Sequence, residues 1–166
     1  MANPALHVVP QDPLTPYPMD LDRLAAAVSQ FATLDQPNDH TSTAIRFSVG
    51  DERFVSSFNS NGRYLSVRRT WAPGPQFGTR RGPVLIALDN WNRTRYYPTL
   101  YTLETPTLGF RLVADATIDA QHGLSEAQLD EFLLIALSTC SEAIDFVSWA
   151  ADKVLSLDSP PRHERF

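Results

Sequence analysis

Residues that could carry out chemistry are few and scattered in this sequence. The chain has one cysteine, Cys140, and seven glycines, of which Gly74, Gly78 and Gly82 are not spaced as a phosphate-binding loop. Neither a nucleophile elbow nor a paired-carboxylate motif is present. The four histidines fall in predicted loops or termini, without a histidine or cysteine partner at metal-ligand spacing: His7, His40, His122 and His163. The sequence therefore predicts no catalytic residue, no cofactor and no metal site.

Cys140 falls on the apolar side of a predicted helix, where a thiolate is disfavoured. The pattern therefore favours a packed cysteine over a nucleophile or a redox thiol. Catalytic residues can be scattered along a sequence, so an enzyme is kept as a hypothesis. It is less favoured than a protein-binding module or a ligand-binding sensor.

Charge is unevenly distributed along the chain. The net charge of -5 combines -4 in residues 1–45, +6 in residues 46–111 and -7 in residues 112–166. A basic middle between acidic ends could bind an anionic partner. Alternatively, a basic sheet faces acidic helices of its own chain or of a second copy. The acidic total predicts no nucleic-acid partner.

Length and composition indicate one ordinary globular domain. The chain has 166 residues, of which 43% are hydrophobic and 20% are charged. A single cysteine excludes an internal disulfide framework. The longest purely aliphatic run, Leu133 to Leu137, is far shorter than a membrane span, and no export signal is readable. We expect a soluble, cytoplasmic protein without membrane contact.

The first half of the sequence predicts an arm, a helix and three strands. Residues 1–19 contain five prolines and read as an extended arm. Asp20 is a plausible N-cap for a helix that runs to about Asp35, with apolar residues at helical spacing up to Phe31. Thr15 followed by Pro16 is an alternative start, because proline is tolerated in a first turn. From residue 41 to 71 the apolar period changes to two, and Asn61-Gly62 is a tight-turn dipeptide. This pattern predicts a meander of three antiparallel strands.

The second half predicts a helix, two strands and a long final helix. Residues 84–91 suit one helix face, although 84–88 also fits a buried strand. Alternation then predicts strands over residues 97–103 and 108–118. Ser125 and Gln128 form a capping box that begins a helix from about Glu126 to Leu157, followed by a flexible tail, 158–166. Its apolar stripe is Leu129, Phe132, Leu133, Ala136, Cys140, Ala143, Ile144, Val147 and Ala151.

Two segments resemble the YbjN family of bacterial proteins. One is Leu88-Asp89-Asn90-Trp91-Asn92-Arg93 followed by Tyr97-Pro98, and the other runs from Leu108-Gly109-Phe110-Arg111-Leu112 into Gly123-Leu124-Ser125-Glu126-Ala127-Gln128-Leu129. The resemblance covers about residues 20 to 155. It implies a fold like type III secretion chaperones, which are small α+β proteins that often form homodimers, and a role described as sensory transduction regulation. It implies no catalytic residue.

Together, the residues and the resemblance predict an α+β domain over residues 20–157. We expect a five-stranded, mostly antiparallel sheet with helices on one face, in the order α-β-β-β-α-β-β-α. The leading functional hypothesis is a non-enzymatic, chaperone-like or regulatory module that binds proteins. The alternative is a sensory domain that binds a small ligand. Trp91, Asn92 and Pro98 are predicted to be structural, with Trp91 in the core and Asn92 capping a helix C-terminus.

Three apolar residues lie outside the stripe of the long helix: Ile135, Phe146 and Trp149. Exposing such side chains in a monomer is costly, which predicts a homodimer, unless the arm or the 71–82 loop covers them. Arginines flank the third strand and form a possible partner surface for a protein or peptide client: Arg63, Arg68 and Arg69. Strand alternation places Arg68 on the face opposite to Arg69. Solvation by water alone is the simpler interpretation of these arginines.

Overall fold

The computed structural model describes residues 9–35, 43–72, 77–107 and 109–158. The predicted tail after Asp158, the segment 36–39 that follows the predicted first helix, and three of the histidines (7, 40 and 163) lie outside these residues. In chain order the elements are α1 (Leu21–Val28), β1 (Thr33–Leu34), β2 (Ala44–Val49), β3 (Glu52–Phe58), β4 (Tyr64–Trp71), α2 (Phe77–Thr94), β5 (Thr99–Thr105), β6 (Gly109–Asp119) and α3 (Glu126–Asp158).

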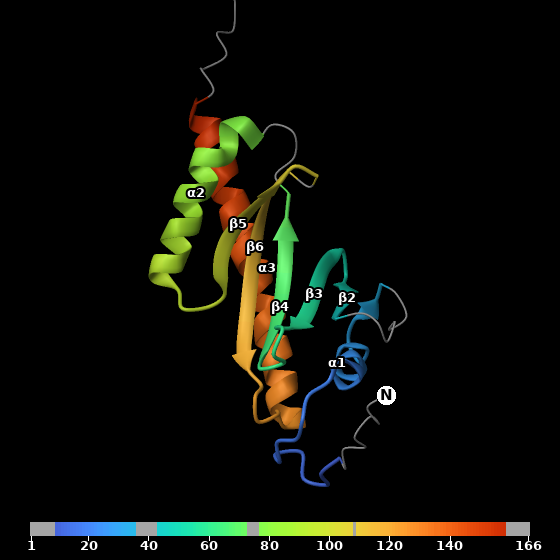
Figure 1. Ribbon diagram of the computed structural model, residues 1–166. Helices are drawn as coiled ribbons and strands as arrows, with labels where there is room; N and C mark the ends of the chain where they lie inside the picture. The colour runs from blue at the N-terminus through green and yellow to red at the C-terminus, as the bar shows by residue number, and fades with distance from the viewer. Residues whose placement is uncertain (1–8, 36–42, 73–76, 108, 159–166) are drawn as a thin grey trace, which may run out of the picture.

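All strands belong to one antiparallel sheet, ordered β1-β2-β3-β4-β6-β5, and this confirms the predicted α+β class (Figure 1). The sheet has six strands rather than the predicted five, because the prediction missed the short strand β1. Thr33 pairs with Ser48, and Leu34 pairs with Phe47. Two residues are too few to show an alternating pattern, so no local pattern indicates this strand.

Helix α1 begins as predicted and ends earlier than predicted. The Asp20 carboxylate accepts a hydrogen bond from the Arg23 N–H at 2.8 Å and caps the helix. After Val28 the chain turns, because the N–H groups of Phe31 and Ala32 both donate to the Val28 carbonyl, at 3.2 and 3.0 Å. This turn leads into β1. Phe31 therefore leaves the helix face and is 45% exposed.

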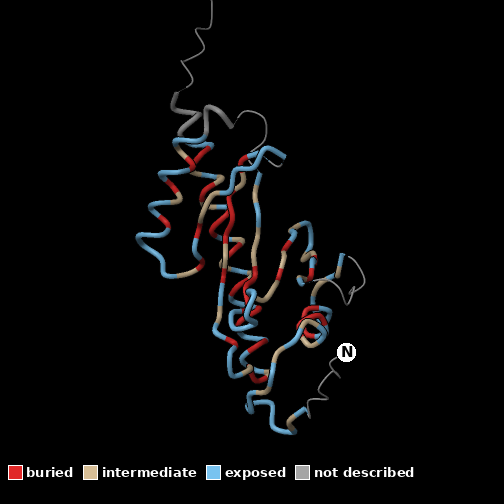
Figure 2. The backbone as a smooth tube through the Cα atoms, viewed as in Figure 1, coloured by how far each residue is buried: buried red, intermediate tan, exposed pale blue. Residues whose placement is uncertain are grey.

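Helix α3 covers the middle of one sheet face. In Figure 1 it passes behind β4 and β6, the two strands it contacts most in the sheet. Leu65 and Val67 of β4 and Leu112 and Ala114 of β6 are fully buried on this side. All nine residues of the predicted α3 stripe are buried, and Figure 2 shows the buried positions concentrated along α3 and these strands. The main core therefore lies between α3 and the centre of the sheet.

The capping box predicted at the start of α3 is confirmed. The Gln128 side-chain oxygen accepts from the Ser125 N–H at 2.9 Å, and the Ser125 hydroxyl accepts from the Gln128 N–H at 3.1 Å. The helix spans 33 residues, which is about 50 Å at 1.5 Å per residue.

Helix α2 packs beside α3 and contains residues 84–88, which resolves the helix-or-strand alternative. Trp91 is buried and its indole N–H donates to the Pro98 carbonyl at 3.1 Å. Its ring also lies 5.6 Å from the ring of Phe146. Trp91 thus joins α2 to both β5 and α3.

Asn92 does not cap α2, and that prediction was wrong. Its amide N–H donates to the Leu100 carbonyl at 2.7 Å, and its amide oxygen accepts from the Leu100 N–H at 2.9 Å. The side chain therefore pairs with the outer edge of β5 as a neighbouring strand would.

The described part of the proline-rich arm contacts the domain at Tyr17. Tyr17 forms a two-way backbone bridge with Leu124, and its hydroxyl bonds the Glu126 carboxylate. Arg23 stacks its guanidinium 3.3 Å from the centre of the Tyr17 ring and donates to the Leu124 carbonyl at 2.8 Å. Residues 17–19 are thereby fixed against the start of α3.

From Glu126 to Lys153, α3 is long and apolar enough to cross a membrane by length and composition alone. The run of purely aliphatic residues, Leu133 to Leu137, is much shorter than this apolar stretch and does not reveal it. Core helices share it, and the buried stripe of α3 accounts for much of its apolar composition.

Two adjacent leucines of α3 allow a test of the packing. Leu133 is fully buried, whereas Leu134 is 71% exposed. Leu133→Ala should lower the free energy of unfolding by about 3 kcal/mol, because it leaves a cavity under the helix. The matched control Leu134→Ala should change it by less than about 0.5 kcal/mol. Urea unfolding followed by circular dichroism measures both, and equal effects would contradict the described orientation of α3.

Candidate functional site: an apolar groove beside the long helix

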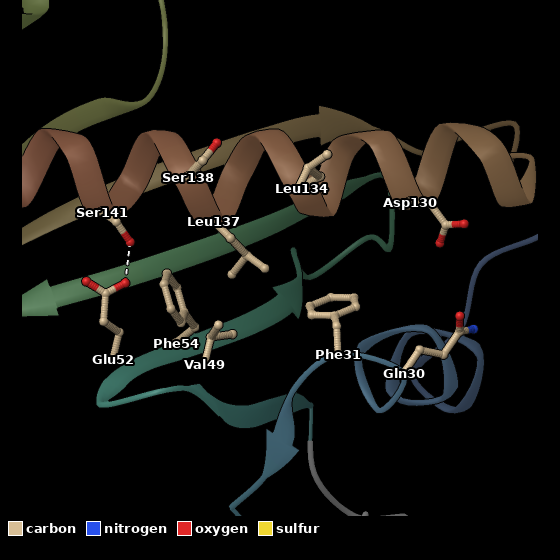
Figure 3. A pocket seen from close by; sticks show the side chains of 10 residues that line it. All are labelled: Gln30, Phe31, Val49, Glu52, Phe54, Asp130, Leu134, Leu137, Ser138 and Ser141. Atoms are coloured by element: carbon tan, nitrogen blue, oxygen red, sulfur yellow. Dashed lines mark hydrogen bonds between the residues drawn. The ribbon is translucent and has the colours of Figure 1, made fainter.

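A groove of about 520 Å³ lies between α3, the end of α1 and the turn from β2 to β3. We call it the α3 groove. In Figure 3, Leu137 and Ser141 of α3 point toward Phe54 and Glu52 of β3. The lining residues are Gln30, Phe31, Val49, Glu52, Phe54, Asp130, Leu134, Leu137, Ser138 and Ser141.

The floor and outer wall come from α1 and the β2–β3 hairpin. Phe31 is placed by the turn after α1, opposite α3 (Figure 3). Gly50 has φ of 57°, a conformation that favours glycine, and it turns the chain directly after Val49. Phe54 is almost fully buried, with its ring stacked on Phe47 at a centroid distance of 5.7 Å. The floor is therefore rigid, whereas Phe31 at the mouth is open to solvent.

The other wall is one side of α3. Asp130, Leu134, Leu137 and Ser141 are spaced by four, three and four residues, so they share one side of the helix. Leu137 points from the helix toward Phe54 in Figure 3. With Leu134 at the mouth, this wall is apolar between a carboxylate at one end and a hydroxyl at the other.

A charged network closes one end of the groove. The Ser141 hydroxyl bonds the Glu52 carboxylate, and Arg69 bonds the same carboxylate at 2.8 Å. Arg69 also donates to the Ser141 carbonyl at 3.2 Å and lies 3.5 Å from a carboxylate oxygen of Asp145. Its side chain is only 17% exposed. These bonds tie β3 and β4 to α3 and fix the width of the groove at this end.

The chemistry of the groove suits binding better than catalysis. Its walls are apolar, and its polar groups lie at the rim or bond one another. Binding pockets are typically apolar with a few orienting polar groups, whereas catalysis needs several such groups converging on one point. Among the described residues, no group of three metal-binding side chains comes together.

Cys140 is buried in the core and lies outside the groove. Its sulfur approaches the carbonyl oxygens of Val67 at 3.8 Å and Ala114 at 3.7 Å. Burial, helped by the negative charge of Asp115, raises the pKa of this thiol to about 12. The thiol is therefore protonated at neutral pH and is unsuited to act as a nucleophile.

The three apolar residues predicted to lie off the α3 stripe have separate surroundings. Phe146 is half-buried against Trp91 of α2. Ile135 and Trp149 remain 42% and 59% exposed. Ile135 also lines a second cavity of about 460 Å³, on the side of α3 that faces Tyr97. The structure therefore does not bring these three residues into one patch.

The arginines predicted as a partner surface are divided between two faces of the sheet. Arg69 lies on the face covered by α3, within the network that closes the groove. Arg68 lies on the opposite face and bonds Asp115 at 2.8 Å, and Arg63 bonds Asp119 at 2.6 Å. All three guanidiniums thus have carboxylate partners in their own chain.

No pattern in the sequence predicts the α3 groove. Phe31 was placed on the buried face of α1, and Leu134 was not recognised as exposed. For Leu134 a signal existed, because a residue one position after Leu133 is rotated by about 100° from the stripe. For Phe31 none existed, since the end of α1 depends on the pairing of β1 with β2.

Comparison with known proteins agrees with this architecture, a single antiparallel sheet with helices on one face. The family model of YbjN, described as "Putative bacterial sensory transduction regulator", matches residues 20–149. The chain belongs to the YbjN family. No curated protein matches the sequence.

A solved structure has the same fold: the crystal structure of YbjN from E. coli, described as a putative transcription regulator. The TM-score is 0.58 at 11% sequence identity, and the alignment covers 86% of this chain and 96% of that one.

The burial of Cys140 leads to a prediction about its reactivity. Ellman's reagent should react with Cys140 slowly in the native protein and fully in urea, because the thiol is enclosed by α3 and the sheet. Absorbance of the released thiolate measures both rates. A stoichiometric reaction as fast as that of free cysteine under native conditions would mean that the thiol is accessible.

Proposed function

We propose that this protein is a non-enzymatic regulatory module that binds an apolar segment of a partner protein in the α3 groove. The observation that carries the proposal is the groove itself, with apolar walls at the mouth and a rigid charged network at one end. Exposed apolar surface of this kind is typical of interaction sites. The family description as a regulator supports a binding role over catalysis.

The exposure of the two mouth residues favours a peptide over a small ligand. Leu134 and Phe31 stand on opposite walls, and both remain largely open to solvent. An apolar side chain of a partner would cover both, while Gln30 and Ser138 at the rim offer hydrogen bonds to its backbone. This is the arrangement of a helix or strand laid in a groove.

A small apolar ligand is the second candidate, and the volume of the cavity favours it. The groove holds about 520 Å³, within the range of ligand pockets. In this case the protein would be a sensor whose ligand reaches Phe54 on the floor.

Peptide selection distinguishes the two candidates. A phage library of random peptides is selected on the wild-type protein and depleted on Leu134→Glu, which places a carboxylate at the mouth. We expect peptides with an apolar anchor that bind Leu134→Glu at least about tenfold more weakly, because the anchor would be buried beside a charge. The matched control Leu103→Glu, which introduces the same charge at an exposed leucine of β5 outside the groove lining, should bind them unchanged.

Absence of peptides that depend on Leu134 would contradict the peptide proposal. If the dye anilinonaphthalene sulfonate nevertheless bound the wild type, and Leu134→Glu abolished its fluorescence, the groove would be a small-ligand site. Thermal unfolding of each variant shows that the fold is kept.

We also propose a homodimer through the outer side of α3, supported by the exposure of Trp149 and Ile135. Pairing two such helices would bring together carboxylates from each copy, among them Glu131, whereas Arg95 already pairs with Glu142 in the same chain. We therefore expect association that strengthens with NaCl, since salt screens this repulsion. Sedimentation equilibrium should show a mass above 18.5 kDa that Trp149→Ser lowers. A monomer at every salt concentration would refute the dimer.

A further inference from the structure

The sheet face opposite α3 carries a group of arginines. Strand alternation places Arg46, Arg53, Arg68 and Arg111 on this face, and we call it the arginine face. No helix of the described residues packs on it, since α1, α2 and α3 all contact the other side or the edges (Figure 1). The α3 groove lies on the covered side, so the two surfaces are separate.

Strand register brings three of these arginines around one valine. Arg46 pairs with Val55, and Val55 pairs with Arg68, so the two arginines are two strand spacings, about 10 Å, apart. Arg53 lies two residues along β3 from Val55, which is about 7 Å. Long arginine side chains at these separations can contact neighbouring anionic groups on one bound molecule.

The arginines differ in how far their charge is already satisfied. Arg68 bonds Asp115 at 2.8 Å. Arg46 and Arg53 are exposed, and neither forms an ion pair with another residue that the structure describes. Within the described strands, the carboxylates on this face are Asp115 near the middle and Asp119 at the end, where Arg63 bonds it. Directly after β1, the Asp35 carboxylate accepts a hydrogen bond at 2.8 Å from the hydroxyl of Ser48, the residue that pairs with Arg53 on this face. Arg46 and Arg53 outnumber this one carboxylate, so their region keeps a net positive charge.

We propose that the arginine face binds an extended acidic segment of a partner protein. In an extended chain, side chains at alternate positions lie on one side, about 7 Å apart. Carboxylates at this interval match the separations of Arg46, Arg53 and Arg68. Arginine forms strong charge-assisted bonds with carboxylates, and Val55 offers apolar contact between them.

The aromatic residues of this face favour a peptide over a nucleic acid. Single-stranded nucleic acid needs free aromatic rings on which bases stack. The ring of Tyr64 already lies 4.9 Å from the guanidinium carbon of Arg63, and the Tyr101 hydroxyl bonds Asp115 at 3.4 Å. The net charge of -5 also repels a long polyanion, whereas a short acidic segment meets only the local positive patch.

The test is fluorescence anisotropy of a labelled peptide of alternating glutamate and valine, about ten residues long. It should bind the full chain at low salt and release at high salt. Arg46→Gln with Arg53→Gln should weaken binding at least about tenfold. The matched control, Arg93→Gln with Lys153→Gln, removes the same charge from α2 and α3 and should leave binding nearly unchanged.

A gain of affinity provides an independent arm. Asp115→Asn keeps the shape of the side chain, removes the carboxylate near the middle of the face and frees Arg68. We expect it to tighten peptide binding by about threefold to tenfold. Thermal unfolding confirms that each variant is folded, so a loss of binding is not a loss of structure.

Several outcomes would overturn the proposal. Failure of the wild type to bind the peptide at low salt would do so, as would equal weakening by the control pair. Tighter binding of an oligothymidylate of equal charge would assign the face to nucleic acid. Self-association that Arg46→Gln with Arg53→Gln abolishes would assign it to a second copy of this chain.

Discussion

The architecture depends on the close packing of α3 across β4 and β6. In the middle of the helix stripe three successive residues are small, Ala136, Cys140 and Ala143, at intervals of four and three. The strand below offers Ala114 and Ala116, which are also fully buried. Small residues on both sides allow the helix to approach the sheet, and the Cys140 sulfur then reaches two strand carbonyls. A larger side chain at any of these positions would force the layers apart.

A single straight helix cannot cover a twisted six-stranded sheet, and the two short helices complete the layer at opposite ends. Helix α2 contacts β5 and α3, whereas α1 contacts β1, β2 and α3 (Figure 1). Between α1 and α3 the helix layer is open, and Phe31, Val49 and Leu137 line the α3 groove there. The groove is thus a consequence of how the helix layer divides. Arg69 stabilises its end because its buried charge is matched by Glu52 and Asp145.

The sequence predicted the elements whose signals are local. Alternation found β2, β3, β4 and β6, and the period of α3 identified every residue of its buried stripe. Features that depend on distant pairing were missed. The end of α1 and the existence of β1 both depend on backbone bonds to β2, and Asn92 pairs with β5 through its side chain. The α3 groove combines residues from three separated segments, and no local pattern reports such a combination.

The arginines of the basic middle of the sequence lie in two kinds of surroundings. Part of the basic middle pairs with acidic residues of α3, as Arg69 does with Asp145 and Arg95 with Glu142. Strand alternation sends four others to the uncovered face, where α3 cannot neutralise them: Arg46, Arg53, Arg68 and Arg111. Because the period of a strand is two, the neighbours Arg68 and Arg69 lie on opposite faces of the sheet. The net charge of the segment therefore does not measure its capacity to bind an anion; the face on which each guanidinium lies decides it.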